Sequence, residues 1–154
     1  MYKQILLPFD GSNGAADALH HAAEIARWAD TSIDLLYVAD TAFDSLTTVR
    51  TDVIDVLVQE GEETLKDAGQ TLDTLGVNSR SDVVQGNPAP TIADYADRYG
   101  YDLIILPTHG RKGVSRYLLG SITEKVVRLA SVPILTVRMG SNEELIFPYQ
   151  DILI

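Results

Sequence analysis

The fold of this chain is decided by residues 102–138, which read DLIILPTHGRKGVSRYLLGSITEKVVRLASVPILTVR. Two short aliphatic runs, residues 102–106 and 133–137, flank a polar, glycine-rich loop and an amphipathic segment that begins after Gly120. Continuous aliphatic runs of this length are typical of strands buried on both faces, and a helix between two of them predicts parallel pairing. Within the amphipathic segment, three residues at helical spacing are expected to face the sheet: Ile122, Val126 and Leu129.

The preceding residues repeat this alternation of apolar runs and helical patterns. Three further runs are predicted to be strands: residues 2–8, 32–38 and 79–85. The resulting order, βαβαβαβαβ, indicates an α/β protein with one open parallel sheet and helices on both faces. The third run is the most polar, so we expect it nearer an edge of the sheet. A length of 154 residues suits one domain.

Capping residues mark the starts of the predicted helices. Ser12 is a candidate N-cap for the first helix, and Asn87 followed by Pro88 supplies a cap and a proline at the first helical position of the third. A buried stripe is expected along that third helix: Ile92, Ala96 and Tyr99. The second pattern, residues 46–75, is long for a single helix and contains two glycines that could loosen it, Gly61 and Gly69.

Bulk composition excludes several classes of protein. The chain has no cysteine, which rules out disulfides, thiol catalysis and thiolate metal sites. We find no signal peptide and no apolar run approaching the roughly 18 to 20 residues that span a bilayer, so we expect a cytoplasmic protein. A net charge of −10 argues against general binding to nucleic acid or membrane surfaces. The excess of Asp over Glu and the scarcity of Lys fit a halophilic source and an ordinary acidic protein equally well.

Positive charge is concentrated in one part of this acidic chain. Residues 107–138 hold six basic side chains and one acidic side chain, a net charge of +5, whereas the remainder carries −15. Such a basic region suits a small polyanion, although its side chains could equally pair with the acidic surface.

Two loops follow strands whose carboxyl ends could border a ligand site, because ligands of open parallel sheets bind beyond those ends. The first loop, residues 8–12, contains Asp10, whose carboxylate could accept hydrogen bonds from a ribose hydroxyl or an adenine amine. The structural alternative, favoured from this loop alone, is that Asp10 stabilises the Asp-Gly turn or caps the next helix.

The second loop, residues 107–121, has features of a phosphate site. Gly110 and Gly120 allow close approach of the backbone to a ligand, and Gly120-Ser121 precedes a helix whose first N–H groups would face an anion. Positive charge lies nearby: Arg111, Lys112 and Arg116. Neither the P-loop pattern nor GxGxxG is present, and glycines at such junctions are commonly structural, so both interpretations stay open.

The sequence resembles the universal stress protein family. The resemblance rests on ILLPFDGS at residues 5–12, LLYVAD at residues 35–40 and above all THGRKGVSRYLLGSITEKVVRLASVPILTVR at residues 108–138. ATP-binding members of the family carry G-x2-G-x9-G-[ST], and Gly110, nine intervening residues, Gly120 and Ser121 match its second half. The resemblance covers nearly the whole chain up to Arg138.

The resemblance implies a Rossmann-like five-stranded sheet in the order 3-2-1-4-5, with ATP bound between the first and fourth strands and Mg²⁺ able to accompany it. Pro8, Phe9 and Asp10 would contact adenine and ribose, and Val38 would line the adenine pocket. Ribose and phosphates would be held by the second loop and the start of its helix, in which we place the remaining site residues: Pro107, His109, Gly110, Arg111, Gly120, Ser121 and Ile122.

The sequence departs from the family motif at Pro107, which occupies the position of the motif's first glycine. Proline has no N–H and a fixed φ, so nucleotide binding is weakened if that glycine donates a hydrogen bond or allows close approach. If only a tight turn is needed, proline can serve. His109 is expected to orient the loop by hydrogen bonding, and we assign no catalytic residue and no metal ligand.

The segment after the predicted domain, residues 140–154, contains the apolar runs LIFPY and ILI. We expect a universal stress protein domain at residues 1–139 and a docked apolar extension at residues 140–154. The family resemblance favours a homodimer through the fifth strand, so the extension is expected to dock there or on its own domain.

Two functions follow from these features. The first is a stress-response or signalling module that binds ATP or another adenine nucleotide, with slow or no hydrolysis. The alternative is a dimeric interaction protein of the same fold that does not bind nucleotide. A dedicated ATPase or phosphotransferase is less favoured, because the sequence points to no positioned base.

Overall fold

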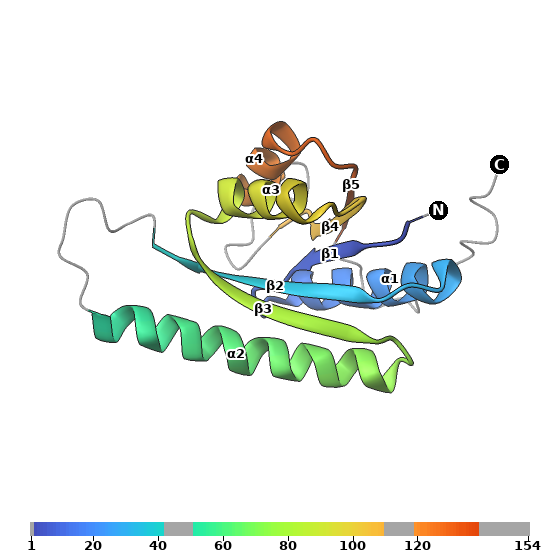
Figure 1. The fold of residues 1–154 in the computed structure, drawn as a ribbon, viewed down its shortest axis with the longest axis horizontal. Coiled ribbons are helices and arrows are strands. Elements are labelled where there is room, and N and C mark those ends of the chain that lie inside the picture. Colours follow the sequence, from blue (N-terminus) through green and yellow to red (C-terminus); the bar gives the residue numbers. More distant parts are fainter. Residues whose placement is uncertain (1, 42–50, 110–118, 139–154) are drawn as a thin grey trace.

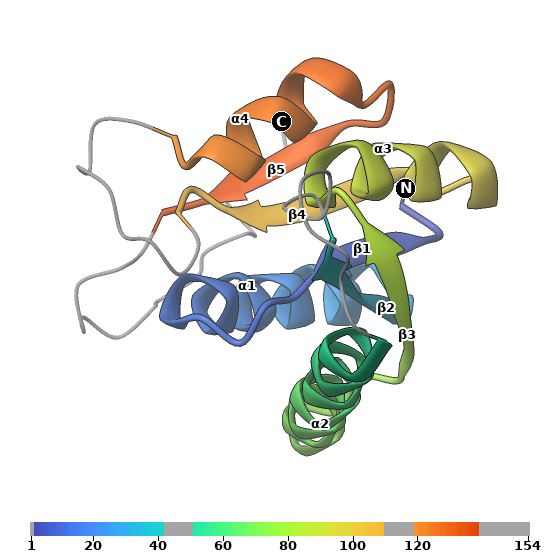
Figure 2. The ribbon, with the colours of Figure 1, turned by 90° about the vertical axis from the view of Figure 1, so that its left-hand side faces the viewer.

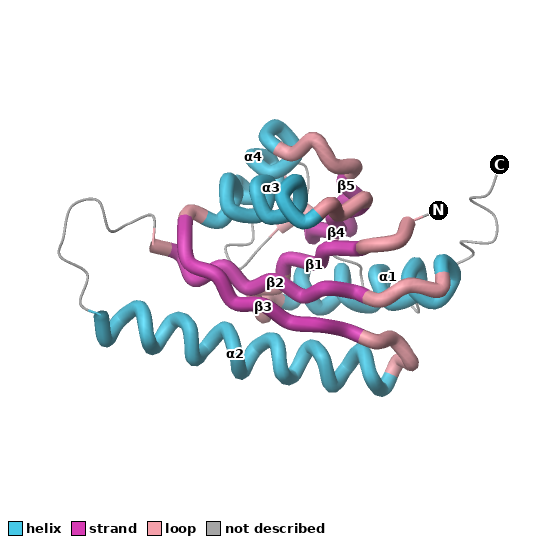
Figure 3. The backbone as a smooth tube through the Cα atoms, in the orientation of Figure 1, coloured by secondary structure: helices cyan, strands magenta, loops and turns pink. Residues whose placement is uncertain are grey.

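The computed structural model describes residues 2–41, 51–109 and 119–138 of the chain. Its elements follow the predicted alternation (Figures 1 and 3). In chain order they are β1 (Ile5–Pro8), α1 (Asn13–Ala29), β2 (Ile33–Asp40), α2 (Thr51–Thr74), β3 (Ser79–Gly86), α3 (Pro88–Tyr99), β4 (Leu103–Pro107), α4 (Ser121–Leu129) and β5 (Ile134–Val137).

The strands form one parallel sheet in the order β3-β2-β1-β4-β5. This arrangement confirms the α/β fold class and the strand order that the family resemblance implied. The polar strand β3 lies at one edge, as its sequence predicted, and β5 lies at the other. The strand order places β1 beside β4, although β2 and β3 separate them along the chain.

Helices cover both faces of the sheet (Figure 1). One core cluster lies between the sheet and helices α1 and α2, and it contains Ile5 and Leu7 of β1. The other lies against α3 and α4 and contains Leu6, the residue between them. Successive strand side chains point to opposite faces, so a strand covered on both sides must be apolar throughout. This requirement explains the continuous aliphatic runs in β1 and β4.

The helices α1 and α3 start where the sequence predicted, but only one of the two predicted N-cap residues makes a capping hydrogen bond. The Ser12 hydroxyl accepts a hydrogen bond from the Ala15 N–H at 3.1 Å, which confirms Ser12 as the N-cap of α1. Asn87 occupies the N-cap position of α3, but its side chain makes no capping hydrogen bond to the described first turn. Pro88 then begins the helix, where its missing N–H costs no intrahelical bond. None of the described helices is long and apolar enough to cross a membrane.

Helix α2 runs unbroken from Thr51 to Thr74, so its two glycines do not loosen it. Gly61 has a packing role, because a Cβ atom there would lie 2.5 Å from Cδ1 of the buried Tyr37 ring. At Gly69 the nearest heavy atom to such a Cβ is the Ser79 hydroxyl oxygen at 3.6 Å, an ordinary contact. The absence of a side chain at Gly61 therefore lets α2 pack closely against β2.

Three residues that were predicted to face the sheet are exposed instead. Tyr99 is 56% exposed because it is the last residue of α3, and its ring lies against Tyr95. On α4, Ile122 is 43% exposed and Leu129 54% exposed. The buried face of α4 consists of Thr123 and Val126, so its inward stripe begins one residue later than predicted and omits the last helical residue.

The different surroundings of the two α2 glycines predict opposite effects of alanine. Gly61→Ala should lower the free energy of unfolding by about 1–3 kcal/mol, because the clash with Tyr37 outweighs a gain of about 1 kcal/mol in helix propensity. Gly69→Ala, the matched control, should raise it by about 0.5–1 kcal/mol. Urea denaturation of both variants measures these differences. Equal stabilisation by both substitutions would contradict the proposed close packing.

Candidate functional site

The candidate site begins where β1 and β4 separate. These strands pair at Ile5–Leu103 and Leu6–Ile104, and their pairing stops there. β1 continues to Pro8 beside β2, and β4 continues to Pro107 beside β5. The carboxyl ends of the two strands are therefore unpaired with each other, at the point where the strand order reverses. Figure 2 shows the sheet from the left-hand side of Figure 1, with β1 next to β4.

Two prolines remove hydrogen-bond donors from the facing edges of this gap. The Phe9 N–H donates to β2 at 2.8 Å, so the backbone nitrogen of the preceding Pro8 faces the other neighbour, β4. Likewise, the Thr108 N–H donates to β5 at 2.9 Å, so the nitrogen of Pro107 faces β1. Because neither nitrogen carries a hydrogen, the two strands cannot extend their ladder across the gap.

This geometry defines what Pro107 changes. It costs β4 no hydrogen bond to β5, because its nitrogen does not point to that neighbour. It does remove a donor from the gap itself, where glycine would present an N–H. Proline is therefore compatible with the strand, and its effect on binding depends on whether a ligand in the gap needs that donor.

The first predicted loop places Asp10 just beyond β1. One carboxylate oxygen of Asp10 accepts a hydrogen bond from the Ser12 N–H at 2.9 Å, the pattern of an Asx turn. Gly11, between them, has φ of 79°, a conformation that glycine adopts without strain. The structural role weighed for Asp10 is thus present, and its half-buried position at the carboxyl edge leaves it beside the gap.

Two hydrogen bonds join the two ends of the second loop. The Gly120 N–H donates to the Thr108 carbonyl at 2.6 Å, and the Thr123 hydroxyl donates to the Pro107 carbonyl at 2.7 Å. Both bonds join the start of α4 to the end of β4. The threonines were not predicted as site residues; their side chains are buried, yet nothing in their sequence spacing distinguishes them from core or surface threonines.

The position of His109 agrees with a loop-orienting role. It is only 5% exposed, and its Nδ1 lies 3.1 Å from the Thr108 hydroxyl oxygen. The role of His109 in orienting the loop stays a prediction. Gly110 and Arg111, together with Lys112 and Arg116, lie outside the described residues.

The start of α4 presents the features of an anion site. Gly120 is the N-cap with extended backbone angles, φ −61° and ψ 154°, and Ser121 and Ile122 of the first turn are exposed. N–H groups in the first turn of a helix have no intrahelical acceptor and carry a partial positive charge. The bond from Gly120 to Thr108 fixes Gly120 next to the end of β4. The first turn of α4, which starts at Ser121, therefore lies beside that strand.

Val38 lies farther inside the strand than the sequence indicated, because β2 extends to Asp40. It is half-buried and packs against the core cluster under α3 and α4.

The carboxyl ends of β1 and β4 bring together most of the described site residues. Pro8, Phe9 and Asp10 lie at the end of β1, and Pro107, His109 and Gly120 lie at the end of β4. Among the described residues, no group of three or more His, Asp or Glu side chains could hold a metal ion.

Comparison with known proteins agrees with the fold. The model of the universal stress protein family matches residues 1–138. A universal stress protein of Methanocaldococcus jannaschii is 34% identical over 146 residues, covering 93% of this chain and 86% of the relative. Another from the same archaeon is 28% identical over 92% of this chain and 98% of its own length. A universal stress protein from Bacillus subtilis is 28% identical over 90% of this chain and 100% of its own length.

Solved structures give the same result. The structure of that second Methanocaldococcus protein superimposes with a TM-score of 0.82 at 29% identity, covering 92% of this chain and 99% of the other. UspA from Lactobacillus plantarum gives 0.78 at 28% identity, covering 89% and 98%. More distant structures of the fold, 20–21% identical, were solved with cAMP, AMP or dAMP bound. Over residues 1–138, this chain belongs to the universal stress protein family.

Proposed function

We propose that the protein is a cytoplasmic stress-response module that binds ATP, or another adenine nucleotide, between the carboxyl ends of β1 and β4. The observation that carries the proposal is the unpaired gap between these strands, with Asp10 on one side and the first turn of α4, fixed by Gly120, on the other. This arrangement offers a carboxylate for the nucleoside and backbone donors for phosphates.

Two further observations support the nucleotide as ligand. Residues 107–138 carry a net charge of +5 in a chain of −10, so an anion is attracted to the second loop more than to the rest of the molecule. In addition, the family members solved with cAMP, AMP or dAMP share the fold of this chain. Adenine as the base is taken from those relatives, whereas the anion site follows from the charge and from the start of α4.

Each predicted site residue except Pro107 has a role in this proposal. Asp10 accepts a hydrogen bond from the ribose or adenine while it keeps the turn to Ser12, and Pro8, Phe9 and Val38 supply the apolar side of the pocket. The phosphates are held by the backbone N–H groups of Gly110, Ser121 and Ile122, with Mg²⁺ on the phosphate oxygens, and Gly120, whose own N–H is bonded to Thr108, lets the phosphates approach closely. Arg111 contributes charge, and His109 orients the loop. Hydrolysis is slow or absent, because His109 is buried against Thr108 and the proposal places no other base by the phosphates.

The site predicts a specific response to substitutions at Gly120 and Pro107. Wild-type protein should bind ATP with micromolar affinity, and Gly120→Ala should weaken binding at least about tenfold by blocking close approach of the phosphates. Ordinary backbone angles at Gly120 allow alanine without conformational strain, and a thermal melt checks that the buried position accepts the added methyl group. Pro107→Gly restores a donor to the gap and should bind at least as tightly as wild type. Calorimetry at matched low and high salt measures all three.

The same titrations distinguish the alternative function. If the wild type fails to bind at either salt concentration while Pro107→Gly binds, Pro107 is the disabling change. The protein is then better described as a dimeric interaction protein of the same fold. If neither protein binds, the nucleotide proposal itself is wrong.

A charge-removing substitution at Asp10 separates its two roles. Asp10→Asn retains an oxygen that can accept the Ser12 N–H, so the stability of the turn should be nearly unchanged. Loss of the charged acceptor should weaken nucleotide binding by about 1.5–3 kcal/mol, roughly 10- to 150-fold. Calorimetry and a thermal melt of the same sample check both outcomes. Unchanged affinity would assign Asp10 to the turn alone.

We also propose a homodimer formed through the β5 edge. β5 is an edge strand, and exposed apolar side chains lie on the adjacent α4: Ile122, Val127 and Leu129. Exposed apolar surface beside an unpaired strand edge favours association. The expected extension, residues 140–154, lies outside the described residues; we propose that it follows a domain of residues 1–139 and docks at this interface.

Deletion of residues 140–154 should therefore weaken the dimer. The full-length chain should elute as a dimer at micromolar concentration, and the truncated chain should shift toward monomer under the same conditions. Size-exclusion chromatography with light scattering measures the masses directly. A truncated chain that remains as fully dimeric as the parent would show that the extension docks elsewhere.

A further inference from the structure

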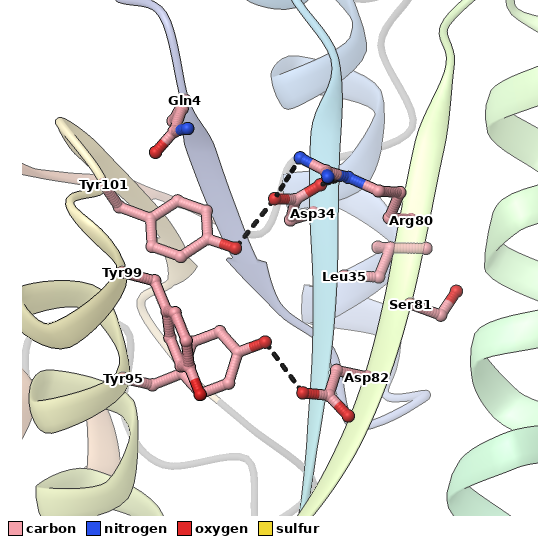
Figure 4. A pocket seen from close by; sticks show the side chains of 9 residues that line it. All are labelled: Gln4, Asp34, Leu35, Arg80, Ser81, Asp82, Tyr95, Tyr99 and Tyr101. Atoms are coloured by element: carbon pink, nitrogen blue, oxygen red, sulfur yellow. Dashed lines mark hydrogen bonds and ion pairs between the residues drawn. The ribbon is translucent and has the colours of Figure 1, made fainter.

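A second cleft lies at the opposite end of the sheet from the proposed nucleotide site. It has a volume of about 400 Å³, within the range of small-ligand pockets, and lies between α3 and the beginnings of β2 and β3 (Figure 4). The nucleotide site follows the carboxyl ends of the strands, whereas this cleft borders their amino-terminal halves. Its lining residues are Gln4, Asp34, Leu35, Arg80, Ser81, Asp82, Tyr95, Tyr99 and Tyr101.

One wall of the cleft is aromatic. The ring of Tyr95 lies between two others, with its centroid 4.6 Å from that of Tyr99 and 5.9 Å from that of Tyr101. Figure 4 views the rings of Tyr95 and Tyr101 nearly face on, and the two planes differ by 24°. Tyr99 remains largely exposed, so the aromatic wall reaches solvent rather than closing as a core.

The other wall carries more negative than positive charge. The Arg80 guanidinium donates two hydrogen bonds to Asp34, at 3.1 and 3.3 Å, and neutralises it. The Tyr101 hydroxyl donates to the same carboxylate at 2.7 Å. Asp82, by contrast, accepts a hydrogen bond at 2.8 Å from Tyr95, which is a neutral phenol. Among the described residues Asp82 forms no ion pair, although Lys66 lines a neighbouring cavity with it and Arg80 lines this cleft, so the two carboxylates and one guanidinium leave the cleft with one net negative charge.

Both bridging tyrosines stay neutral at physiological pH. Burial, followed by the hydrogen bond to Asp82, raises the pKa of Tyr95 to about 12, and burial with the bond to Asp34 raises the pKa of Tyr101 still further. Each hydroxyl therefore remains a donor to its carboxylate at neutral pH. Neutral, electron-rich rings with their faces toward a cleft attract cations.

Other ligands fit this combination less well. An anion would meet two carboxylates, and a neutral aromatic ligand would leave Asp82 unpaired. A divalent metal ion prefers several oxygen ligands, and the described residues provide no cluster of three acidic or histidine side chains. The tyrosine–carboxylate bonds also join α3 to β3 through Tyr95 and the segment after α3 to β2 through Tyr101, but such bracing does not require the exposed ring of Tyr99.

We propose that this cleft binds a small organic cation with an alkylated ammonium group. The alkyl groups lie against the faces of the tyrosine rings, and the positive charge is balanced by Asp82. Contact with aromatic faces favours a diffuse, weakly hydrated cation over a strongly hydrated one such as Na⁺. This site is independent of the proposed nucleotide site, since the two share no residue.

Choline chloride tests the proposal, with 3,3-dimethyl-1-butanol as its uncharged isostere and ionic strength held constant with NaCl. In amide-resolved NMR titrations of the full chain, choline should give saturable shifts at Asp82, Tyr95, Tyr99 and Tyr101 in the millimolar range. The isostere should bind at least about tenfold more weakly. Asp10 and Gly120 should not shift, which separates this site from the nucleotide site.

Two variants provide matched controls. Asp82→Asn retains an acceptor for the Tyr95 hydroxyl but removes the charge, and Tyr99→Leu retains apolar bulk but removes an exposed ring. Each should weaken choline binding about three- to tenfold, with a thermal melt close to that of wild type and unchanged ATP titrations. Equal binding of choline and its isostere, no saturation, or wild-type affinity in both variants would overturn the proposal.

Discussion

The separation of β1 from β4 after Leu6 and Ile104 is the constraint on which the candidate site depends. In a fully paired sheet, backbone donors and acceptors of adjacent strands satisfy each other and leave no room for a ligand. Here Pro8 and Pro107 face the gap without a donor, while the start of α4 is held at its rim by the bond from Gly120 to Thr108. The prolines thus coincide with the end of the ladder, and separate bonds from Gly120 and Thr123 place the first-turn N–H groups of α4 beside the end of β4.

Much of this architecture could be predicted from the sequence, because its signals are local. Short runs between helical patterns, most of them aliphatic, located all five strands, and the polar character of residues 79–85 placed β3 at an edge. The uninterrupted course of α2 could not be predicted, since Gly61 is explained by the ring of Tyr37, a residue distant in sequence. The direction of the Pro107 nitrogen likewise depends on which neighbour receives the Thr108 N–H. That information lies in the sheet register and not in the motif.

The tyrosines illustrate the same limit at the other end of the molecule. Helical spacing correctly places Tyr95 and Tyr99 on α3, but spacing cannot show that the sheet beneath them presents Asp34, Arg80 and Asp82. The cleft brings α3 together with β2, an element distant in sequence, and with the adjacent β3, so that Tyr99 lines a polar cleft where a buried position was expected. The aromatic, acidic cleft lies near the amino ends of the strands, at the opposite end of the sheet from the proposed nucleotide site.

The location of bound nucleotide is the most direct test of the account as a whole. Mn²⁺–ATP, a paramagnetic substitute for Mg²⁺–ATP, broadens the NMR signals of nearby amides in the folded chain. Nucleotide bound between β1 and β4 should broaden selectively the signals of Asp10 and of the first turn of α4, Ser121 to Thr123, with the signals of Tyr95 and Tyr101 little affected. Broadening centred on the tyrosine cleft, or none at saturating ATP, would contradict nucleotide binding between β1 and β4.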